Sequence, residues 1–454
     1  MMSVRYGVYR HLSHNARLLQ RATLTPSFEE KLRVEVTAAK RVQSIKTRRR
    51  DGGEVQLRGG RTLRDDKGFK VRRIESSKHS KSRKQPDPPY DVETKGSLRF
   101  IKPYYFTYKT FCKERWRGRE LLEVFTREFR DRRESYYRQC IENGSVFVNG
   151  KPAKVDTVLR DSDLISHRIH RHEPPVTAEP VTIVSQDENI MVIDKPRGIP
   201  VHPTGRYRFN TVTKMLEQQL GYTVHPCNRL DRLTSGLMFL AKTPLGADIM
   251  GDQLKTREVS KEYIARVVGE FPMSEVTVER SVRSYDPRVA LNVVCDASDP
   301  NGKHAKTVFN RVSFDGSTSI VRCRPLTGRQ HQIRVHLQFL GHPIANDPIY
   351  SDAIAWGSTL GKGGLTDYSE VARRLHEVGK SRSASTWFYP EIAGEVLLQE
   401  TCRECSTELN STPDIRELTL WLHAYRYRST SADPARQWDY QTAWPAWAGP
   451  QPQR

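Results

Sequence analysis

The spacing of apolar residues divides the chain into three parts. Residues 1 to 97 hold few periodic apolar positions, and from about residue 40 they are rich in Lys, Arg, Gly and Ser. After residue 100 apolar side chains recur at helical spacing, and beyond residue 176 short apolar runs alternate with turn signals. The pattern predicts a disordered basic tail (1–97), a small module (98–175) and a larger domain (176–450).

Helices and a hairpin are predicted in the small module. Four apolar residues between 121 and 129 share one helical face. An Asn-Gly pair at 143 and 144 predicts a helix end, and a second pair at 149 and 150 follows the apolar run Val146–Val148. The last segment of the module, His172–Pro175, is held extended by its prolines and is predicted to be a linker to the larger domain.

The larger domain is predicted to be of the α+β class. Asn189–Ile193, Gly236–Leu240 and Leu418–Leu422 are apolar runs of strand length, separated by helical stretches. Residues 351 to 417 show little periodicity and are rich in Gly, Ser and charged side chains. They are predicted to be an insertion or a long surface segment.

The charge of the chain favours a polyanionic partner. Lys and Arg number 74 against 53 Asp and Glu, a net charge of +21, of which residues 1 to 99 contribute +14. Such an excess suits nucleic acid or an anionic membrane surface. No apolar run approaches the roughly 20 residues that span a bilayer, so a membrane protein is not expected.

The amino terminus leaves the compartment open. Its first 28 residues carry four arginines and no acid before Glu29. This composition fits a mitochondrial transit peptide, and it fits a basic disordered tail equally well. The protein is therefore expected in the mitochondrion or in the cytoplasm or nucleus.

The cysteines and clustered histidines are predicted to hold no metal. Seven scattered cysteines favour a reducing compartment over a disulfide framework. Cys402 and Cys405 form one C-x-x-C pair, but a structural zinc site needs two more ligands and there is no second pair. His167, His170 and His172 stand among arginines, whose charge opposes a cation. We expect two free thiols, and histidines that contact RNA or solvent.

One carboxylate stands out by its neighbours. Asp231 lies between Arg229 and Arg232, just before an apolar strand. The flanking cations favour its ionised form, and the strand would fix its position. The residues alone allow two interpretations, a catalytic carboxylate and a structural ion pair.

A second polar segment lies at Pro325–Leu337 and holds two arginines, two histidines and two glutamines. Gln330, Arg334 and Leu337 have the spacing of one helical face. The segment either presents a surface that binds phosphates or bases, or is a solvated helix face.

Together the two segments resemble the RluA family of pseudouridine synthases, whose hallmarks are an R-L-D-x-x-T-S-G loop and a T-G-R-x-H-Q-I-R helix. Residues 229–236 and 327–334 match them. Supporting matches follow in order between 180 and 350, among them Asp194-Lys195-Pro196 and Asp347–Tyr350. The resemblance implies a mixed, mainly antiparallel catalytic sheet preceded by an αL-type RNA-binding module.

The resemblance also assigns roles. Asp231 is the catalytic carboxylate, Tyr263 stacks on the base and Arg334 pairs with the aspartate. Arg229 would fill the space that a flipped nucleotide leaves. Many relatives have histidine at the position of Asn228, so a contact made by that histidine is in doubt here. Further residues expected to contact RNA are Arg232, Arg329, His331, Lys195 and His202.

The activity implied is isomerisation of a uridine to pseudouridine within RNA, by a monomer that uses no cofactor and no metal. Within the family the chain resembles the eukaryotic branch that includes fungal tRNA synthases acting on position 32 of the anticodon loop. Messenger or ribosomal RNA as substrate is an alternative, as is a non-catalytic RNA-binding protein or chaperone. The chemical step taken by Asp231 stays open.

Overall fold

The computed structural model describes residues 87–129, 134–381, 397–405, 407–410 and 412–449. Most of the predicted basic tail, including the possible transit peptide, lies outside these residues. The tail prediction is wrong for its last residues, because Val92–Lys95 form strand β1. Three of its four residues are exposed, so no apolar alternation marked it as a strand. Residues 432–437, with the 3₁₀ helix η4 (Pro434–Arg436), belong to a separate structural unit.

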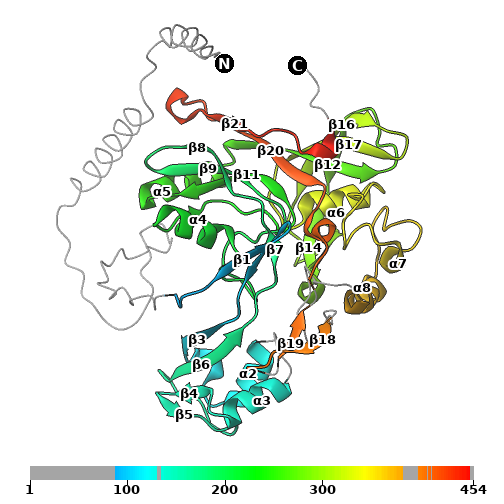
Figure 1. The fold of residues 1–454 in the computed structure, drawn as a ribbon. Helices are drawn as coiled ribbons and strands as arrows, with labels where there is room; N and C mark the ends of the chain where they lie inside the picture. Colours follow the sequence, from blue (N-terminus) through cyan, green and yellow to red (C-terminus); the bar gives the residue numbers. More distant parts are fainter. Residues whose placement is uncertain (1–86, 130–133, 382–396, 406, 411, 450–454) are drawn as a thin grey trace, which may run out of the picture. The chain divides into compact units, whose positions relative to one another are not determined.

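A mixed sheet of ten strands dominates the rest of the chain (Figure 1). Its main path runs β13-β16-β17-β12-β20-β11-β9-β8, with β10 beside β11 and β21 beside β20. Every described pair in it is antiparallel except β11 and β20, which run parallel. This confirms the α+β class and the mainly antiparallel sheet. The strands are β8 (Thr182–Gln186), β9 (Ile190–Lys195), β10 (His225–Pro226), β11 (Ser235–Ala241), β12 (Val259–Val268), β13 (Val276–Glu279), β16 (Lys306–Phe314), β17 (Thr318–Pro325), β20 (Leu422–Ser429) and β21 (Asp439–Gln441).

Strand β11 has a continuous apolar run, residues 237–241, because both of its faces are covered. Met238 and Leu240 pack in a cluster with residues of helix α4 (Val212–Leu220). Leu237 and Phe239 point the other way, into a cluster that includes Met250 of helix α5 (Pro244–Lys255). A strand buried on both faces shows a continuous apolar run instead of alternation.

The other half of the sheet is covered by helix α6 (Gln332–Phe339). Ile333 and Leu337 of this helix pack with Val267 of β12. The opposite face of β12 places Ile264 in a cluster with Tyr425 of β20, close to the 3₁₀ helix η5 (Ala446–Ala448). A hairpin of β14 (Ser281–Asp286) and β15 (Leu291–Cys295), joined by η2 (Pro287–Val289), packs against the other side of α6.

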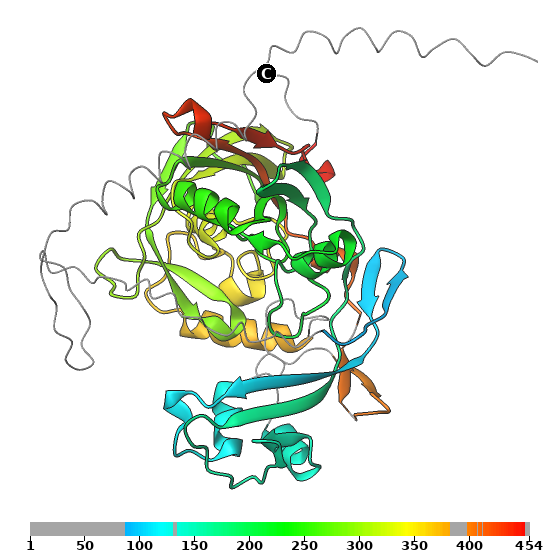
Figure 2. The ribbon, with the colours of Figure 1, turned by 90° about the vertical axis from the view of Figure 1, so that its left-hand side faces the viewer.

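The predicted small module has its own sheet and core (Figure 2). Strand order is β3-β6-β4-β5, and the Asn-Gly turn at 149 and 150 joins the last two strands as predicted. Leu121, Phe125 and Ile141 pack against Trp116 and Val146 in its core. The elements are β3 (Tyr104–Phe111), η1 (Glu114–Trp116), α2 (Leu121–Glu128), α3 (Glu134–Glu142), β4 (Val146–Val148), β5 (Lys151–Pro152) and β6 (Leu164–Arg171).

The predicted linker after β6 is extended but firmly held. Glu173 is 7% exposed, and its carboxylate accepts hydrogen bonds from the backbone N–H groups of residues 208, 209 and 210. The hydroxyl of Tyr104 donates to the same carboxylate at 2.5 Å. Nearby, β2 (Leu98–Ile101) pairs with β1 and with β7 (Val176–Thr177) in a three-stranded sheet. The module is thus tied to the sheet domain by buried polar contacts.

In the carboxyl-terminal third, the stretch predicted to be an insertion or surface segment contains a partly buried helix, and the predicted last strand begins later than expected. Residues 369–381 form helix α8, and its Val371 and Leu375 are buried in a core cluster with Trp356 of α7 (Ala353–Trp356). The apolar periodicity of α8 covers only a short part of a stretch rich in Gly and Ser, so the helix was not predicted. The strand predicted at 418–422 begins only at Leu422, because a capping box at Asp414 starts the 3₁₀ helix η3 (Ile415–Leu418). Strands β18 (Leu397–Thr401) and β19 (Glu408–Asn410) form a separate hairpin.

Within the described residues, no helix has the length and apolar character needed to cross a membrane.

The parallel contact between β11 and β20 requires glycine at position 236. Gly236 has φ +114°, and a Cβ there would run into the backbone of Ala424. Gly236→Ala is therefore expected to lower the melting temperature markedly, since neither the backbone nor the partner strand can move aside. Gly251→Ala, in α5 with open space around its Cα, is the matched control and should leave the melting temperature unchanged or raise it. Equal melting temperatures for Gly236→Ala and the wild type would contradict the requirement.

Candidate active site

Two cavities meet at Asp231. The larger, of about 610 Å³, is lined by residues that include Tyr263 and Arg329. The smaller, of about 190 Å³, is lined by residues that include His202 and Arg232. Five residues line both cavities: Arg229, Leu230, Asp231, His331 and Arg334. The carboxylate predicted to be catalytic therefore lies where a ligand in either cavity can reach it.

Hydrogen bonds hold the loop that carries Asp231. Lys195 is fully buried in β9, and its ammonium donates to the carbonyls of Pro196, Arg232 and Thr234 at 2.8 to 3.1 Å. Asn228 accepts a hydrogen bond from the backbone N–H of Phe239 at 2.8 Å, which ties the start of the loop to β11. Asn228 therefore has a structural contact of its own at the position where many relatives have histidine.

A buried cation joins Asp231 to a second carboxylate. Arg334 donates to Asp231 at 3.4 Å and to both oxygens of Asp347 at 2.6 and 2.8 Å. The Asp347 side chain is 0% exposed and also accepts from the backbone N–H groups of Ile349 and Tyr350. Asp347 thus fixes the guanidinium through Nε and one terminal nitrogen, and the other terminal nitrogen, Nη1, donates to Asp231.

His331 completes the surroundings of the carboxylate. It has a left-handed backbone, φ +55°, at the start of α6, and its Nε2 lies 3.6 Å from Asp231. Its Nδ1 lies 3.0 Å from the hydroxyl of Tyr350. Burial, with the charge of Arg334, lowers the pKa of His331 to about 4. The imidazole is therefore neutral at neutral pH, and its hydrogen bond with Tyr350 fixes its orientation beside Asp231.

The site keeps Asp231 ionised. Partial burial acts to raise the pKa of Asp231, but the electrostatic effects of His331 and Arg334 and the Arg334 hydrogen bond outweigh it, and the pKa is lowered. Because His331 is neutral above its own low pKa, Arg334 is the cation responsible at neutral pH. The side chain of Asp231 remains 36% exposed, so the charged carboxylate can meet a ligand.

Tyr263 faces the larger cavity from the middle of the sheet. It stands in β12 at an irregularity in the pairing with β20, opposite Ala424. Its hydroxyl lies 2.6 Å from that of Tyr427, and burial, with the charge of Asp231, raises the pKa of Tyr263 to about 12. The phenol is therefore neutral and fixed in orientation by its hydroxyl, and its ring is left to line the cavity.

Most of the residues predicted to bind RNA line the two cavities, but one of them is buried away from both. Arg229 is exposed at the edge of both cavities, and Arg329 lines the larger one while its Nε donates to the carbonyl of His304. Arg232 donates to the hydroxyl of Tyr207 at 3.2 Å. The prediction that Lys195 contacts RNA is wrong. Its side chain is fully buried and bound to three carbonyls, so it has no surface to offer RNA, and it positions the loop instead.

Helix α6 does not present a solvated face, which was one of the two interpretations of the segment Pro325–Leu337. All residues from 332 to 338 are buried, and the helix begins after Gln330, so Gln330 does not share a helical face with Arg334. Sequence reasoning also missed the roles of Asp347 and Tyr427. The run Asp347–Tyr350 was noted only as a family match, and nothing local distinguished Tyr427 from other tyrosines on apolar strands.

Comparison with known proteins gives consistent matches. The sequence model described as RNA pseudouridylate synthase matches residues 189–339. The chain is 55% identical over 425 residues to a Saccharomyces cerevisiae protein named tRNA pseudouridine(32) synthase, mitochondrial, covering 93% of this chain and 91% of that protein. Identity is 38% over 415 residues to human pseudouridylate synthase RPUSD2, covering 78% and 74%. It is 34% over 412 residues to the Saccharomyces cerevisiae tRNA pseudouridine(31) synthase, covering 79% and 97%.

Removing the buried cation of Arg334 is expected to shift the acid limb of the profile of turnover against pH. In Arg334→Gln combined with Asp347→Asn, no carboxylate loses its partner in the core, but Asp231 loses its stabilising charge. The pKa of Asp231 then rises, so the pH below which turnover is lost should move upward. Arg334→Lys, which keeps the charge, should shift it less. The measurement is turnover of an RNA substrate against pH for folded preparations, and an acid limb that stays in place would contradict the role of Arg334.

Proposed function

The chain belongs to the RluA family of RNA pseudouridine synthases, and from this premise we propose that its substrate is the uridine at position 32 of tRNA. It is an enzyme, an intramolecular isomerase. The proposal for position 32 is carried by the 55% identity over nearly the whole length of a relative named for that position, against 34% for a relative named for position 31.

The geometry suits the isomerisation. The bond from the ribose carbon to the uracil nitrogen breaks, the same carbon joins carbon five of the ring, and the proton of carbon five is replaced by one on the freed nitrogen. Asp231, ionised and partly exposed between the two cavities, can act on the sugar, on the ring or on that proton. Arg334 and His331 restrict its movement, so each of these steps begins from a positioned carboxylate.

The larger cavity is proposed to hold the uracil. Tyr263 supplies a flat, neutral ring there, which keeps a detached base while it turns. Arg229 at the shared edge is placed to enter the space that the flipped nucleotide leaves. Arg329 lines the larger cavity and His202 the smaller one, and both are proposed to contact the flanking nucleotides.

Residues 98–175 are proposed to be an αL-type RNA-binding module. Strand β3 exposes Tyr105, Tyr108 and Phe111, and the guanidinium of Arg168 lies 4.1 Å from the ring centre of Tyr105. Exposed aromatic rings beside cations suit stacking on bases and contact with phosphates. Five further arginines of the module are proposed to contact phosphates. Arg115, Arg117 and Arg119 each also pair with a carboxylate of the module, and Arg132 and Arg133 lie outside the described residues.

The mitochondrion is the proposed compartment. The relative that matches 93% of the chain is named as mitochondrial. The arginine-rich first 28 residues, which fit a transit peptide, point the same way. The enzyme is proposed to act there as a monomer.

Asp231→Asn and Asp231→Ala should fold, bind tRNA and form no pseudouridine above background. The loop is held by Lys195 and Asn228 and not by the carboxylate, and no other acid lies within it. Purified proteins are assayed on a tRNA with uridine at positions 31 and 32, with pseudouridine mapped by position and binding measured on filters. Asp248→Asn, on the exposed face of α5, is the control and should modify position 32 only.

Product from either Asp231 variant would contradict the catalytic assignment. Loss of folding would support a structural ion pair instead. The proposed substrate would be contradicted by modification of position 31. It would also be contradicted by modification of a ribosomal or messenger RNA fragment in preference to the tRNA.

Tyr263 is expected to act through its ring. Tyr263→Phe and Tyr427→Phe remove the same hydroxyl contact from its two ends, so both should slow single turnover by a similar and modest factor, about tenfold at most. Tyr263→Ala also removes the stacking face and should be much slower. Equal single-turnover rates for Tyr263→Phe and Tyr263→Ala, in preparations of equal melting temperature, would contradict the stacking role.

A further inference from the structure

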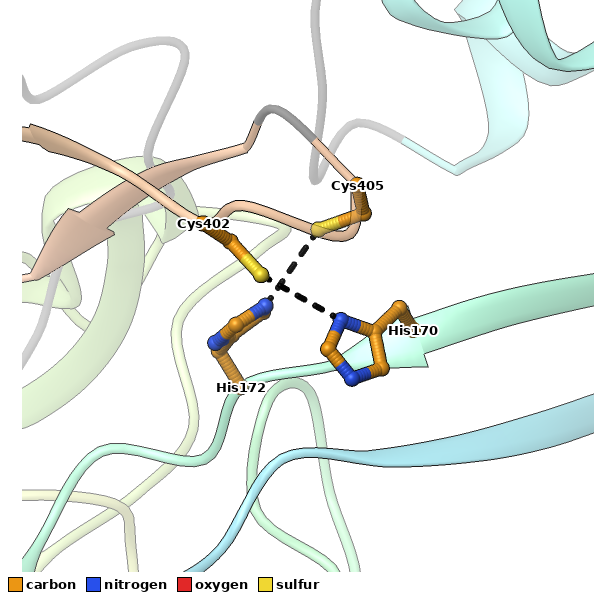
Figure 3. Close-up of side chains that lie close together, drawn as sticks. All are labelled: His170, His172, Cys402 and Cys405. Atoms are coloured by element: carbon orange, nitrogen blue, oxygen red, sulfur yellow. Dashed lines mark hydrogen bonds between the residues drawn. The ribbon is translucent and has the colours of Figure 1, made fainter.

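We propose that His170, His172, Cys402 and Cys405 bind a structural zinc ion. The four side chains come from segments more than 200 residues apart, yet their ligand atoms all lie within 4.8 Å of one another (Figure 3). Two histidines belong to the end of β6 and the residue that follows it, and two cysteines lie in the turn between β18 and β19. The prediction of two free thiols without further ligands rested on the absence of a second C-x-x-C pair. The structure supplies histidines in place of that pair.

The distances between ligand atoms fit a tetrahedral ion. With zinc bonded to sulfur at about 2.3 Å and to nitrogen at about 2.0 to 2.1 Å, a tetrahedral site separates sulfur from nitrogen by about 3.6 Å. In the structure the Sγ of Cys402 lies 3.5 Å from Nδ1 of His170, and the Sγ of Cys405 lies 3.3 Å from Nε2 of His172. These two sulfur–nitrogen pairs are thus already near coordination spacing, and all four ligand atoms lie within 4.8 Å of one another.

The surroundings of His170 are those of a metal ligand. Its Nδ1 faces the thiols, while its Nε2 lies 3.5 Å from the carboxylate of Glu404. A metal-binding histidine commonly directs its other ring nitrogen to a carboxylate, which fixes the tautomer. The side chain of His170 is only 5% exposed, so its ring is held in place and not free in solvent.

The backbone supports both cysteines. The N–H of Cys402 donates to the carbonyl of Thr407 at 2.8 Å and closes the turn. The backbone and the hydroxyl of Thr407 hydrogen-bond the sulfur of Cys405. These contacts fix the turn that places both sulfur atoms beside the two histidines.

Neighbouring arginines do not oppose the ion as the sequence suggested. Arg171 points away, and its guanidinium donates to the carbonyls of Gly205 and Arg206. Arg168 lies over the ring of Tyr105. Two thiolates and two neutral imidazoles balance a divalent cation, so the loaded site has no net charge for an arginine to repel.

Two sulfur and two nitrogen ligands in this geometry select zinc. Soft thiolates with imidazoles in tetrahedral arrangement suit Zn²⁺, and four protein ligands leave no open position for substrate. The ion would join the β18–β19 hairpin to the end of β6 and to the held segment at Glu173. Its role is therefore structural, in fastening the hairpin to the strand that leads out of the RNA-binding module.

Metal content of the purified full-length chain tests the proposal. After growth in zinc-supplemented medium and dialysis against metal-free buffer, the wild type should carry about one zinc per chain. Cys402→Ser with Cys405→Ser, and His170→Gln with His172→Gln, should each lose it. Cys295→Ser and His225→Gln, at positions away from the cluster, are the matched controls and should retain it.

A measurement on the wild type alone guards against variants that fail to fold. After zinc is removed with a chelator, added Co²⁺ should give the visible bands of a tetrahedral ion with thiolate charge transfer, and added zinc should abolish them. The chelator should also lower the melting temperature of the wild type but not that of the Cys402→Ser, Cys405→Ser variant. The proposal would be overturned if the wild type held no more zinc than that variant, or if both double variants retained zinc. It would also be overturned by stoichiometric iron in place of zinc, or by a disulfide between Cys402 and Cys405.

Discussion

Arg334 is the residue on which the geometry of the active site depends. A guanidinium that is 5% exposed would be very costly without partners, and here two carboxylates share it. Asp347, wholly buried, takes two of its N–H groups and is itself held by two backbone amides. The other terminal nitrogen, Nη1, is directed at Asp231, so a wholly buried carboxylate sets the direction of the contact to the exposed one. This arrangement, in which one anion positions the guanidinium and the other faces the cavities, follows from the fixed, planar donor pattern of arginine.

The sheet brings these groups together through one unusual contact. Strands β11 and β20 run parallel for only two residue pairs, at Ser235 and Gly236, where the loop of Asp231 enters the sheet. Close approach of the two backbones there leaves no room for a side chain at Gly236. On the other side of the loop, the buried ammonium of Lys195 gathers three carbonyls that would otherwise need water. Burial, with the charge of Arg232, lowers the pKa of Lys195 to about 7, while the charges of Asp231 and Asp194 act to raise it. The rigidity of the loop thus comes from backbone contacts and not from the ion pair of Asp231.

The features that could be predicted from the sequence are those set by residues close together in the chain. The α+β class, the turn at Asn149 and the loop around Asp231 were predictable because turn residues and apolar runs act over a few positions. Lys195 was misassigned because a lysine on an apolar strand looks like a phosphate ligand until the three carbonyls around it are seen. Strand β1 was missed because it is exposed, and α8 because its apolar face is a single stripe in a polar stretch. The roles assigned to the site residues rest on family resemblance, since the charges around Asp231 fit a structural ion pair equally well.

The same reasoning explains why the histidines and cysteines could not be connected from spacing. Metal ligands in small motifs lie close in sequence because the ion must fold a short segment, and local spacing then identifies them. In a large domain whose sheet and helices fold around their own cores, the ion has a different task, which is to join parts already folded. Ligands can then come in two pairs from distant segments, each pair set by its own local structure: the end of β6 for His170 and His172, and a closed turn for Cys402 and Cys405. Either pair alone is too few ligands for a structural ion, so only the folded chain shows that they meet.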